Sequence, residues 1–509
     1  MFERILIANR GLIQANCVRA VKQLGARALT LFEEDDRDSA GVRNADEAYC
    51  LEQRDPEVRP YLDLEQIVGL AEKLKVDAVH PGYGFLAQNT RFARELEKRG
   101  IHLIAPRAGG SVNFGNKAAV KEAARQCGLP VLDGSAAVSE VGPLREAAGR
   151  LRFPLLVKPA HGYGGIGLRR IRDAGQLEAS LEAVQAVSRN FLLNSPDLYI
   201  EQLLPGARHL EFPVLRDAQG RTVVFPELDC SLQRRYQKLM VETPAWGLDP
   251  DLRARLQSEV RVLCERLGIQ GFASVEFLLK EGRPWFLEIN NYIQPSHTAT
   301  ALLTGVDVLK EQIRLLAGAP LEVPASAVKS DRHVLGVYVF AEDPENNFVP
   351  SPGFVDRLYL PFGEDICLQT SIFSGARVSP YYDPMVAKLL SCGNARDEAV
   401  LKLKIALEEF FVEGVKTNLP LLRGVLESPE FIRGGLTTDF LGNPDARQRI
   451  VEGIKSERDA EVAALVAALA LHRDGEVLKR VGAEEESENP SVFSAATRWL
   501  KPRKNRRSL

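Results

Sequence analysis

Two glutamates in a predicted β-hairpin are the residues best placed to bind a metal ion. Apolar runs flank the turn at Gly282, so Glu276 and Glu288 face each other across the ladder. Asn290 follows on the same face. Opposed carboxylates repel, so the pair favours a cation, and such oxygen ligands suit Mg²⁺ or Mn²⁺ completed by nucleotide phosphates. The alternative is a surface hairpin with incidental acids, which the same repulsion disfavours.

A glycine-rich segment is the second feature that could bind a ligand. An apolar strand predicted over 154–157 leads into Lys158, and the loop after it carries Gly162, Gly164, Gly165 and Gly167. Glycine has no Cβ and adopts positive φ, so such a loop can lay backbone N–H groups against phosphate. The Gly-Lys-Ser/Thr sequence of a Walker loop is absent. Together with Lys158 and the acidic hairpin, the loop predicts a nucleotide site.

Two further lysines could neutralise the charge of a triphosphate. Lys117 begins a helix pattern, and Lys238 follows a basic cluster that also contains Gln233. Taken singly, each lysine is better explained as a solvated surface residue, so the prediction depends on their combination. An apolar strand at 198–204 carries Glu201 into a predicted hinge, where a nucleotide base could lie against main-chain groups.

An α/β framework must position these residues. The first hundred residues alternate strand and helix patterns, with short apolar strands at 4–8, 28–32, 76–80 and 102–105. Such strands predict a doubly wound parallel sheet with covered faces, and the loops at its strand ends form the natural ligand edge. No Gly-x-Gly-x-x-Gly follows the first strand, so a dinucleotide-binding role has no support.

Four regions are predicted along the chain. Residues 1–114 form the parallel-sheet domain, and residues 115–330 form the nucleotide-binding domain, with a lid at about 135–203. Residues 331–446 mix strands and turns with helices and form a third, α+β domain. Residues 447–509 are a helical segment followed by an acidic stretch and a basic end, which we expect to be partly disordered or dependent on a partner.

Length and composition limit the class of protein. With 509 residues, 45% of them hydrophobic and 26% charged, the chain fits a soluble globular protein of several domains. The net charge of −3 gives no indication of nucleic-acid or membrane binding. The N-terminus lacks a secretory-signal pattern, and no apolar run approaches the roughly 18–20 residues of a membrane span. Seven scattered cysteines fit reduced thiols, so we expect a cytoplasmic protein.

Several motifs occur in one order along residues 1–445. They are Ile7-Ala-Asn-Arg-Gly11, His80-Pro-Gly-Tyr-Gly-Phe-Leu86, Arg208-His-Leu-Glu211, Asp229-Cys-Ser-Leu-Gln-Arg-Arg235, Tyr381-Tyr-Asp-Pro-Met385 and Gly414-Val-Lys-Thr-Asn418. In these motifs the chain resembles biotin carboxylase, an ATP-grasp enzyme that is a component of acetyl-CoA, propionyl-CoA and pyruvate carboxylases. The resemblance implies an N-terminal pre-ATP-grasp domain, a central ATP-grasp domain with a glycine-rich lid, and a C-terminal biotin-carboxylase domain.

The resemblance also implies roles for individual residues. Glu276 and Glu288 would bind magnesium or manganese, with Asn290 beside them, and the loop at 162–167 would close over the phosphates of ATP. The implied nucleotide contacts are Lys117, Lys158, Glu201, His209, Gln233, Lys238 and Leu278.

The chain departs from the family pattern at the carboxylation centre. In the family motif Glu-Met-Asn-x-Arg-x-Gln-Val-Glu-His, the bicarbonate-binding arginine is replaced here by Tyr292, and the glutamate that deprotonates bicarbonate by Ser296. The arginine that stabilises the biotin enolate is replaced by Tyr338. A positioned base contributes about 10²–10⁴-fold to a rate, and one preorganised stabiliser of anionic charge about 10²–10³-fold. The replacements therefore predict weak or absent biotin carboxylation.

Three functions remain open. The leading hypothesis is an ATP-binding, biotin-carboxylase-like subunit that acts as a scaffold or nucleotide-responsive partner in a larger carboxylase assembly. The second is an active ATP-grasp ligase with a different acceptor, whose pocket Tyr292, Ser296 and Tyr338 would line. The third is a true biotin carboxylase with compensated residues, for instance His297 or His161 as the base, although the family motif already has a histidine at position 297.

The predicted partners depend on where biotin is carried. The family's acceptor lysine lies between two methionines, and the three methionines here, Met1, Met240 and Met385, exclude a Met-Lys-Met site. We therefore expect no covalent biotin on this chain, and a separate biotin carrier protein and carboxyltransferase. The family also implies a homodimer, or a heteromer with an active biotin carboxylase.

Overall fold

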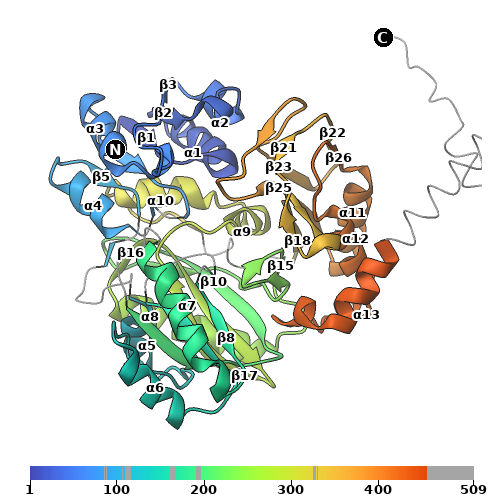
Figure 1. Cartoon of the computed structure of the whole chain (residues 1–509). Helices are drawn as coiled ribbons and strands as arrows, with labels where there is room; N and C mark the ends of the chain where they lie inside the picture. The colour runs from blue at the N-terminus through green and yellow to red at the C-terminus, as the bar shows by residue number, and fades with distance from the viewer. Residues whose placement is uncertain are drawn as a thin grey trace, which may run out of the picture. The chain divides into compact units, whose positions relative to one another are not determined.

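The N-terminal region forms a parallel sheet of five strands (Figure 1). Alternate residues of the first strand lie in different cores, because Ile5 and Ile7 pack in one hydrophobic cluster and Leu6 in another. Both faces of the sheet are therefore buried, which confirms the predicted doubly wound parallel sheet. The strand order is β3-β2-β1-β4-β5, with β1 Arg4–Ile7, β2 Arg27–Phe32, β3 Glu47–Cys50, β4 Ala78–His80 and β5 His102–Leu103.

The computed structural model describes residues 1–84, 86–87, 89–105, 107–108, 116–160, 165, 167–190, 197–324, 328 and 331–454. Gly162 and Gly164 of the predicted phosphate loop, His161, and residues 455–509 of the predicted extension lie outside these ranges. The chain divides into two compact units, Met1–Pro444 and Asp445–Leu509, and all predicted ligand residues belong to the first.

Four helices accompany the parallel sheet: α1 Gly11–Gln23, α2 Ala40–Asn44, α3 Leu64–Lys73 and α4 Thr90–Glu97. The sequence did not indicate β3, since its four residues alternate between half-buried and exposed positions and lack an apolar run. This strand pairs with β2 and lies at the edge of the sheet. An edge strand can expose the side chains of one face to solvent, so it does not need an apolar run.

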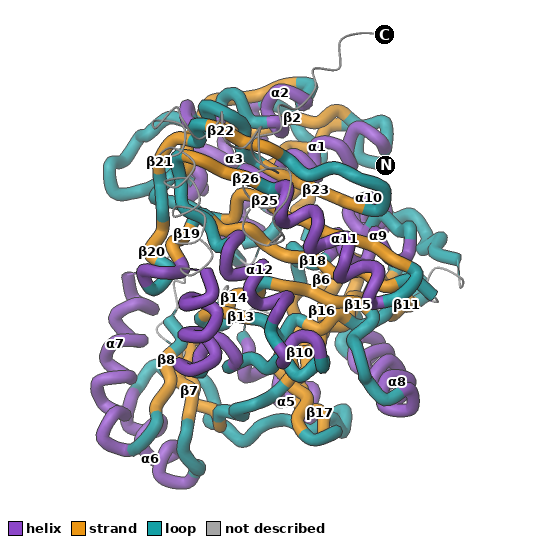
Figure 2. The backbone as a smooth tube through the Cα atoms, turned by 90° about the vertical axis from the view of Figure 1, so that its right-hand side faces the viewer, coloured by secondary structure: helices purple, strands orange, loops and turns teal. Residues whose placement is uncertain are grey.

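A second sheet of ten strands runs through the middle of the unit Met1–Pro444 (Figure 2). Its main path is β17-β16-β10-β12-β15-β18-β25-β23, with β11 paired to β10 and β6 to β16. Because β15 pairs with β18, the sheet continues from the predicted nucleotide-binding region into the predicted third region. The strands are β6 Arg107–Ala108, β10 Arg208–Arg216, β11 Thr222–Val224, β12 Leu228–Asp229, β15 Met240–Thr243, β16 Ile269–Lys280, β17 Arg283–Asn290, β18 His333–Phe340, β23 Ile366–Thr370 and β25 Met385–Gly393.

A three-stranded antiparallel sheet in the order β8-β7-β9 lies within the predicted lid. Leu155 and Val157 of β7 pack with residues of two helices in one apolar cluster. Lys158, the next residue along the strand, points to the opposite face. The elements are β7 Leu155–Pro159, β8 Arg169–Ile171, β9 Leu198–Gln202, α6 Val141–Arg150 and α7 Leu177–Asn190, and α5 Lys117–Gln126 precedes them.

Helices and short ladders complete the fold. The helices are α8 Pro250–Arg266, α9 His297–Thr304, α10 Val308–Leu316, α11 Arg396–Glu409, α12 Leu419–Glu427 and α13 Pro429–Ile432. The short strands are β13 Gln233–Arg234, β14 Gln237–Lys238, β19 Glu342–Asp343, β20 Val349–Pro350, β21 Gly353–Phe354, β22 Arg357–Tyr359, β24 Arg377–Val378 and β26 Phe411–Glu413. Within the described ranges, no helix is long and apolar enough to cross a membrane.

Candidate nucleotide and metal site

The acidic hairpin has the register that the sequence predicted. Glu276 of β16 pairs with Glu288 of β17, and Asn290 follows two residues later in the ladder. Glu281 and Gly282 form a two-residue turn with φ of 51° and 73°. Positive φ at both positions is the geometry that matches the twist of the flanking strands. The turn alone would pair Glu276 with Leu287, but the ladder shifts register by one residue between Glu276 and Phe277, as at a β-bulge. This shift places Glu276 opposite Glu288.

Each glutamate of the hairpin has a cationic partner. Lys238 Nζ donates to Glu276 Oε1 at 2.8 Å, and His209 Nε2 lies 2.8 Å from Glu276 Oε2. Lys117 Nζ donates to Glu288 Oε2. Burial opposes ionisation of Glu276, but Lys238 and His209 outweigh it, so the pKa of Glu276 lies well below its usual range.

Glu288 shows the same balance. Burial opposes its ionisation, Lys117 outweighs that effect, and the pKa of Glu288 is lowered. Asn290 Nδ2 donates to Glu276 Oε1 at 2.9 Å, so the predicted amide lies beside the carboxylates. Within the described part of the chain, no group of three or more His, Cys, Asp or Glu side chains could hold a metal ion. Two ionised carboxylates and an amide fit Mg²⁺, which commonly takes one or two carboxylates and completes its shell with substrate phosphates.

Lys158 belongs to a buried cluster that the sequence revealed only in part. Lys158 and Lys121 both form ion pairs with Glu201. The two ammonium groups lie 5.9 and 5.8 Å from the centre of the Tyr199 ring. Burial lowers the pKa of Lys158 to about 8 and lowers the pKa of Lys121 well below its usual range. Lys121 and Tyr199 were not predicted; the available signal was that Lys121 lies one helical turn after Lys117 and so shares its face.

The residues of the large sheet that the family resemblance implies as nucleotide contacts lie on one face of that sheet. His209 of β10 pairs with Leu278 of β16, and the ladder pairs Glu211 with Glu276 two residues away. Gln233 donates to His209 Nδ1, and the short ladder β13–β14 pairs Gln233 with Lys238. His209, Gln233, Lys238 and Leu278 are therefore neighbours of the acidic hairpin.

Two of the predicted loop glycines fall within the described residues. Gly165 and Gly167 have φ of +74° and +77°, values that side chains rarely adopt. A Cβ at Gly165 would lie 2.9 Å from the carbonyl oxygen of Arg235, so the loop backbone approaches the basic cluster before Lys238 closely. Position 165 therefore requires glycine for two reasons, its positive φ and its close contact with the backbone of Arg235.

The three positions at which the sequence analysis predicts a departure from the family pattern, Tyr292, Ser296 and Tyr338, are buried. Ser296 Oγ donates to Glu211 Oε1 at 2.7 Å, while Lys238 Nζ donates to Glu211 Oε2 at 2.6 Å. Burial raises the pKa of Tyr292 and of Tyr338 well above the usual value, so both phenols are neutral at physiological pH. The hydroxyl of Tyr338 has no hydrogen-bond partner among the described residues. A role for Glu211 in the site was not predicted. Its contact with Ser296 joins positions 85 residues apart, and no local sequence pattern indicates it.

His297 is the candidate substitute base that lies within the described residues, and its contacts are those of a structural histidine. It is 5% exposed, and its Nδ1 lies 2.7 Å from the carbonyl oxygen of Gln294. That contact assigns the proton to Nδ1, because a carbonyl oxygen only accepts. Burial and then Lys388 lower the pKa of His297 well below its usual range. A buried, weakly basic imidazole is a poor proton acceptor.

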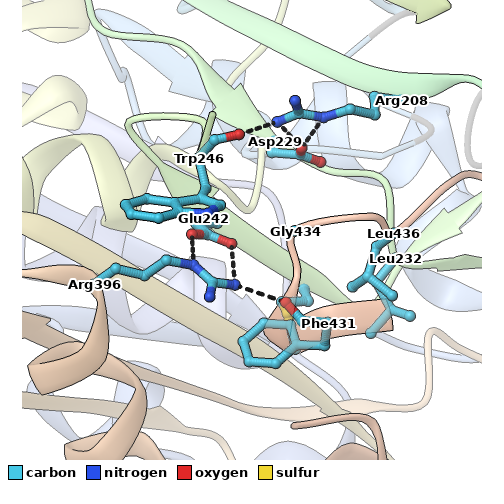
Figure 3. A pocket seen from close by; sticks show the side chains of 10 residues that line it. Arg208, Asp229, Leu232, Glu242, Trp246, Arg396, Phe431, Gly434 and Leu436 are labelled. Atoms are coloured by element: carbon cyan, nitrogen blue, oxygen red, sulfur yellow. Dashed lines mark hydrogen bonds and ion pairs between the residues drawn. The ribbon is translucent and has the colours of Figure 1, made fainter. Parts of the chain in front are cut away.

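A separate hollow lies between the large sheet and the C-terminal helices (Figure 3). Arg396 donates to Glu242 Oε1 at 2.7 Å, and its guanidinium lies 5.3 Å from the Trp246 ring centre and 4.6 Å from that of Phe431. None of the predicted ligand residues lines it. We interpret these contacts of Arg396 as structural, because they connect α11 with β15 and α13.

Comparison with known families agrees with this arrangement. Residues 1–109 match the family described as biotin carboxylase, N-terminal domain, and residues 337–443 match the biotin carboxylase C-terminal domain. Residues 116–323 match the ATP binding domain of the carbamoyl-phosphate synthase L chain.

Relatives and solved structures of the same kind cover most of the chain. Biotin carboxylase of Haemophilus influenzae is 36% identical over 87% of this chain and 98% of its own length. A pyruvate carboxylase subunit of Methanothermobacter thermautotrophicus is 36% identical over 87% of this chain and 90% of its own length. The biotin carboxylase domain dimer of Hydrogenobacter thermophilus 2-oxoglutarate carboxylase, solved with MgADP, ADP and bicarbonate, has a TM-score of 0.83 at 34% identity, covering 89% of this chain and 99% of that one.

Proposed function

Because the chain belongs to the biotin carboxylase family, we propose that it is an ATP-binding ATP-grasp subunit of a biotin-dependent carboxylase assembly with weak or absent carboxylation activity of its own. One observation carries this proposal. The candidate nucleotide and metal side chains lie together, whereas Tyr292, Ser296 and Tyr338 provide neither the base nor the two cations of the family's carboxylation centre. In this proposal the nucleotide half of the site, around Glu276 and Glu288, is retained, and the acceptor half, at Tyr292, Ser296 and Tyr338, has changed.

The nucleotide half would work by exchange of charge partners. Lys117 and Lys238 neutralise Glu288 and Glu276. Glu276 and Glu288 would hold a Mg²⁺ or Mn²⁺ ion that arrives with ATP, and Lys117 and Lys238, released from these carboxylates, would bind the phosphates. Lys158 and the glycines at 162–167 would hold the phosphates, and His209, Gln233, Glu201 and Leu278 would surround the nucleoside. A divalent cation balances the two glutamates that lose their lysines, so neither carboxylate is left as an unpaired buried charge.

The acceptor half lacks the charges that carboxylation needs. The Ser296 hydroxyl is bound to Glu211, and a serine is not a carboxylate base near neutral pH. Tyr292 and Tyr338 are neutral, so neither replaces the positive charge of an arginine beside bicarbonate or an enolate. Loss of one such stabiliser alone costs about 10²–10³-fold in rate.

The partner proposal draws on the names of relatives. One relative is named as part of pyruvate carboxylase, another as the small subunit of 2-oxoglutarate carboxylase, and one solved neighbour is described as a dimer. We propose that this chain likewise forms a homodimer, or a heteromer with an active biotin carboxylase. A separate biotin carrier protein and carboxyltransferase would complete the assembly.

The proposal is tested by ATP binding and ATP cleavage with the purified protein. Calorimetry with ATP and Mg²⁺ should show binding, and phosphate release should not increase when bicarbonate and free biotin are added. Biotin-stimulated cleavage at a rate typical of an active biotin carboxylase would overturn the proposal, as would the absence of ATP binding.

The second candidate function is an ATP-grasp ligase with a less anionic acceptor. The observation in its favour is the Tyr338 hydroxyl, which is buried and has no partner among the described residues. A buried hydroxyl without a partner is costly, and a hydroxyl or carbonyl group of an acceptor would satisfy it. Phosphate release that depends on one member of a panel of small carboxylic acids would favour this function over the first.

A further inference from the structure

Two buried lysines share one carboxylate beside the candidate nucleotide site. Lys121 comes from α5 and Lys158 from β7, and both ammonium groups contact Glu201 of β9. The side chains of Lys121, Lys158 and Glu201 are 8%, 9% and 3% exposed. Within this cluster Glu201 therefore balances only one of the two positive charges.

The ladder explains why the three groups meet. Lys158 pairs with Tyr199 across β7 and β9, so their side chains lie on one face, and Glu201 follows Tyr199 two residues later on that face. Lys121 reaches the face from α5, where it lies one turn after Lys117. A cavity of about 350 Å³ adjoins the cluster and is lined by Lys121, Glu201 and Tyr199 among others.

The shared carboxylate makes it possible for Lys158 to change partners. A phosphate that binds Lys158 draws this ammonium away from Glu201. With only one lysine present, Glu201 would then become a buried, unpaired carboxylate, which is strongly unfavourable. Because Lys121 stays in contact with Glu201, the carboxylate keeps a counter-charge while Lys158 binds the phosphate.

We propose that Lys121 is a positioning residue of the nucleotide site, which holds Glu201 so that Lys158 is free to bind the phosphates of ATP. The inference rests on the proposed function, since it requires that ATP binds at Lys158. It assigns a role to a lysine outside the motifs that carry the family resemblance.

Calorimetry with ATP and Mg²⁺ tests this inference through a double-mutant cycle. Lys121→Met should weaken ATP binding at least about tenfold, because Lys158 must then neutralise Glu201 and compete with phosphate. Lys121→Met combined with Glu201→Gln should restore affinity to within about threefold of the wild type, since no carboxylate is then left to neutralise and the main-chain groups of residue 201 that would meet the base are unchanged. Lys121→Arg keeps the charge and should bind ATP better than Lys121→Met.

The matched control is Arg125→Met, on the same helix and on the wall of the same cavity. Arg125 contacts Glu122 rather than Glu201, so this change removes a positive charge without affecting the shared carboxylate. An equal loss of affinity in Arg125→Met and Lys121→Met would mean a general electrostatic effect and would overturn the inference. So would unchanged affinity in Lys121→Met, or no recovery in the double variant. If the wild type binds no ATP, the proposed function fails and this inference fails with it.

Discussion

Lys238 and Glu211 form a buried ion pair with 2.6 Å between Nζ and Oε2, and the same ammonium lies 2.8 Å from Glu276. One cation therefore bridges two carboxylates, one of them in the candidate metal hairpin and the other bound to the Ser296 hydroxyl. Lys238 is thus the direct connection between the nucleotide half and the acceptor half of the site.

Substitution of Lys238 should destabilise the protein as well as weaken ATP binding. Lys238→Met leaves two buried carboxylates without their common cation, and loss of one partner of a buried pair costs about 3–5 kcal/mol. Urea unfolding should show this decrease in the free energy of unfolding. Lys98→Met removes an exposed ion pair with Glu95 and should change stability by less than about 1 kcal/mol. Equal effects of the two substitutions would contradict the assignment.

Magnesium dependence should reside in the acidic hairpin. Glu288→Gln removes one of the two carboxylates and frees Lys117, so the variant should bind ATP with at most a few-fold loss when magnesium is absent. The increase in affinity that Mg²⁺ gives the wild type should fall by at least about tenfold, because Mg²⁺ depends on its carboxylate ligands. Calorimetry with and without Mg²⁺ measures both quantities. Glu281→Gln, at the exposed turn of the same hairpin, is the control and should retain the full magnesium effect.

Lys388 should make stability depend on pH between about 7 and 10. Its ammonium is fully buried and donates to Pro295 O at 3.2 Å and to Thr298 Oγ1 at 2.7 Å, so it supports the segment that carries Ser296. Burial lowers the pKa of Lys388 from 10.5 to about 7, with Cys367 and Cys17 opposing the shift. Between these values the unfolded chain binds the proton and the folded chain does not, so stability rises with pH by up to about 1.4 kcal/mol per unit.

The measurement is urea unfolding across that pH range for the wild type and Lys388→Met. The variant should have a shallower rise in the free energy of unfolding, because its residue 388 does not titrate. Lys310→Met removes a partly exposed lysine and should keep the slope of the wild type. Parallel slopes for the wild type and Lys388→Met would show that Lys388 stays protonated in the folded protein.

Local patterns predicted the acidic hairpin and four of the five strands of the N-terminal sheet, whereas distant pairings were not predictable. The pairing of Glu276 with Glu288 was predicted from two apolar runs folded about Gly282. In the structure it combines a two-residue turn with a one-residue register shift between Glu276 and Phe277, and the sequence did not indicate this shift. In contrast, the pairing of Lys121 with Glu201 joins positions 80 residues apart. Neither turn chemistry nor periodicity specifies such a contact, because it depends on how α5 packs against β9. The continuation of the large sheet from β15 into β18 has the same origin, since it joins strands that no local turn connects.

Restoring the family's residues at the acceptor half tests the reason proposed for weak carboxylation. The triple variant Tyr292→Arg, Ser296→Glu, Tyr338→Arg should gain at least about 10²-fold in biotin-dependent ATP cleavage, since it regains a base and two anion-stabilising cations. Ser296→Glu alone should gain little and should lose stability. Its new carboxylate would lie against Glu211, and Lys238 already neutralises that residue. The two arginines of the triple variant would relieve this repulsion, so the three changes should be strongly non-additive. Ser296→Ala is the control for loss of the hydroxyl alone and should not increase turnover. A triple variant that folds, binds ATP and still cleaves none in response to biotin would show that something other than these three positions limits the reaction.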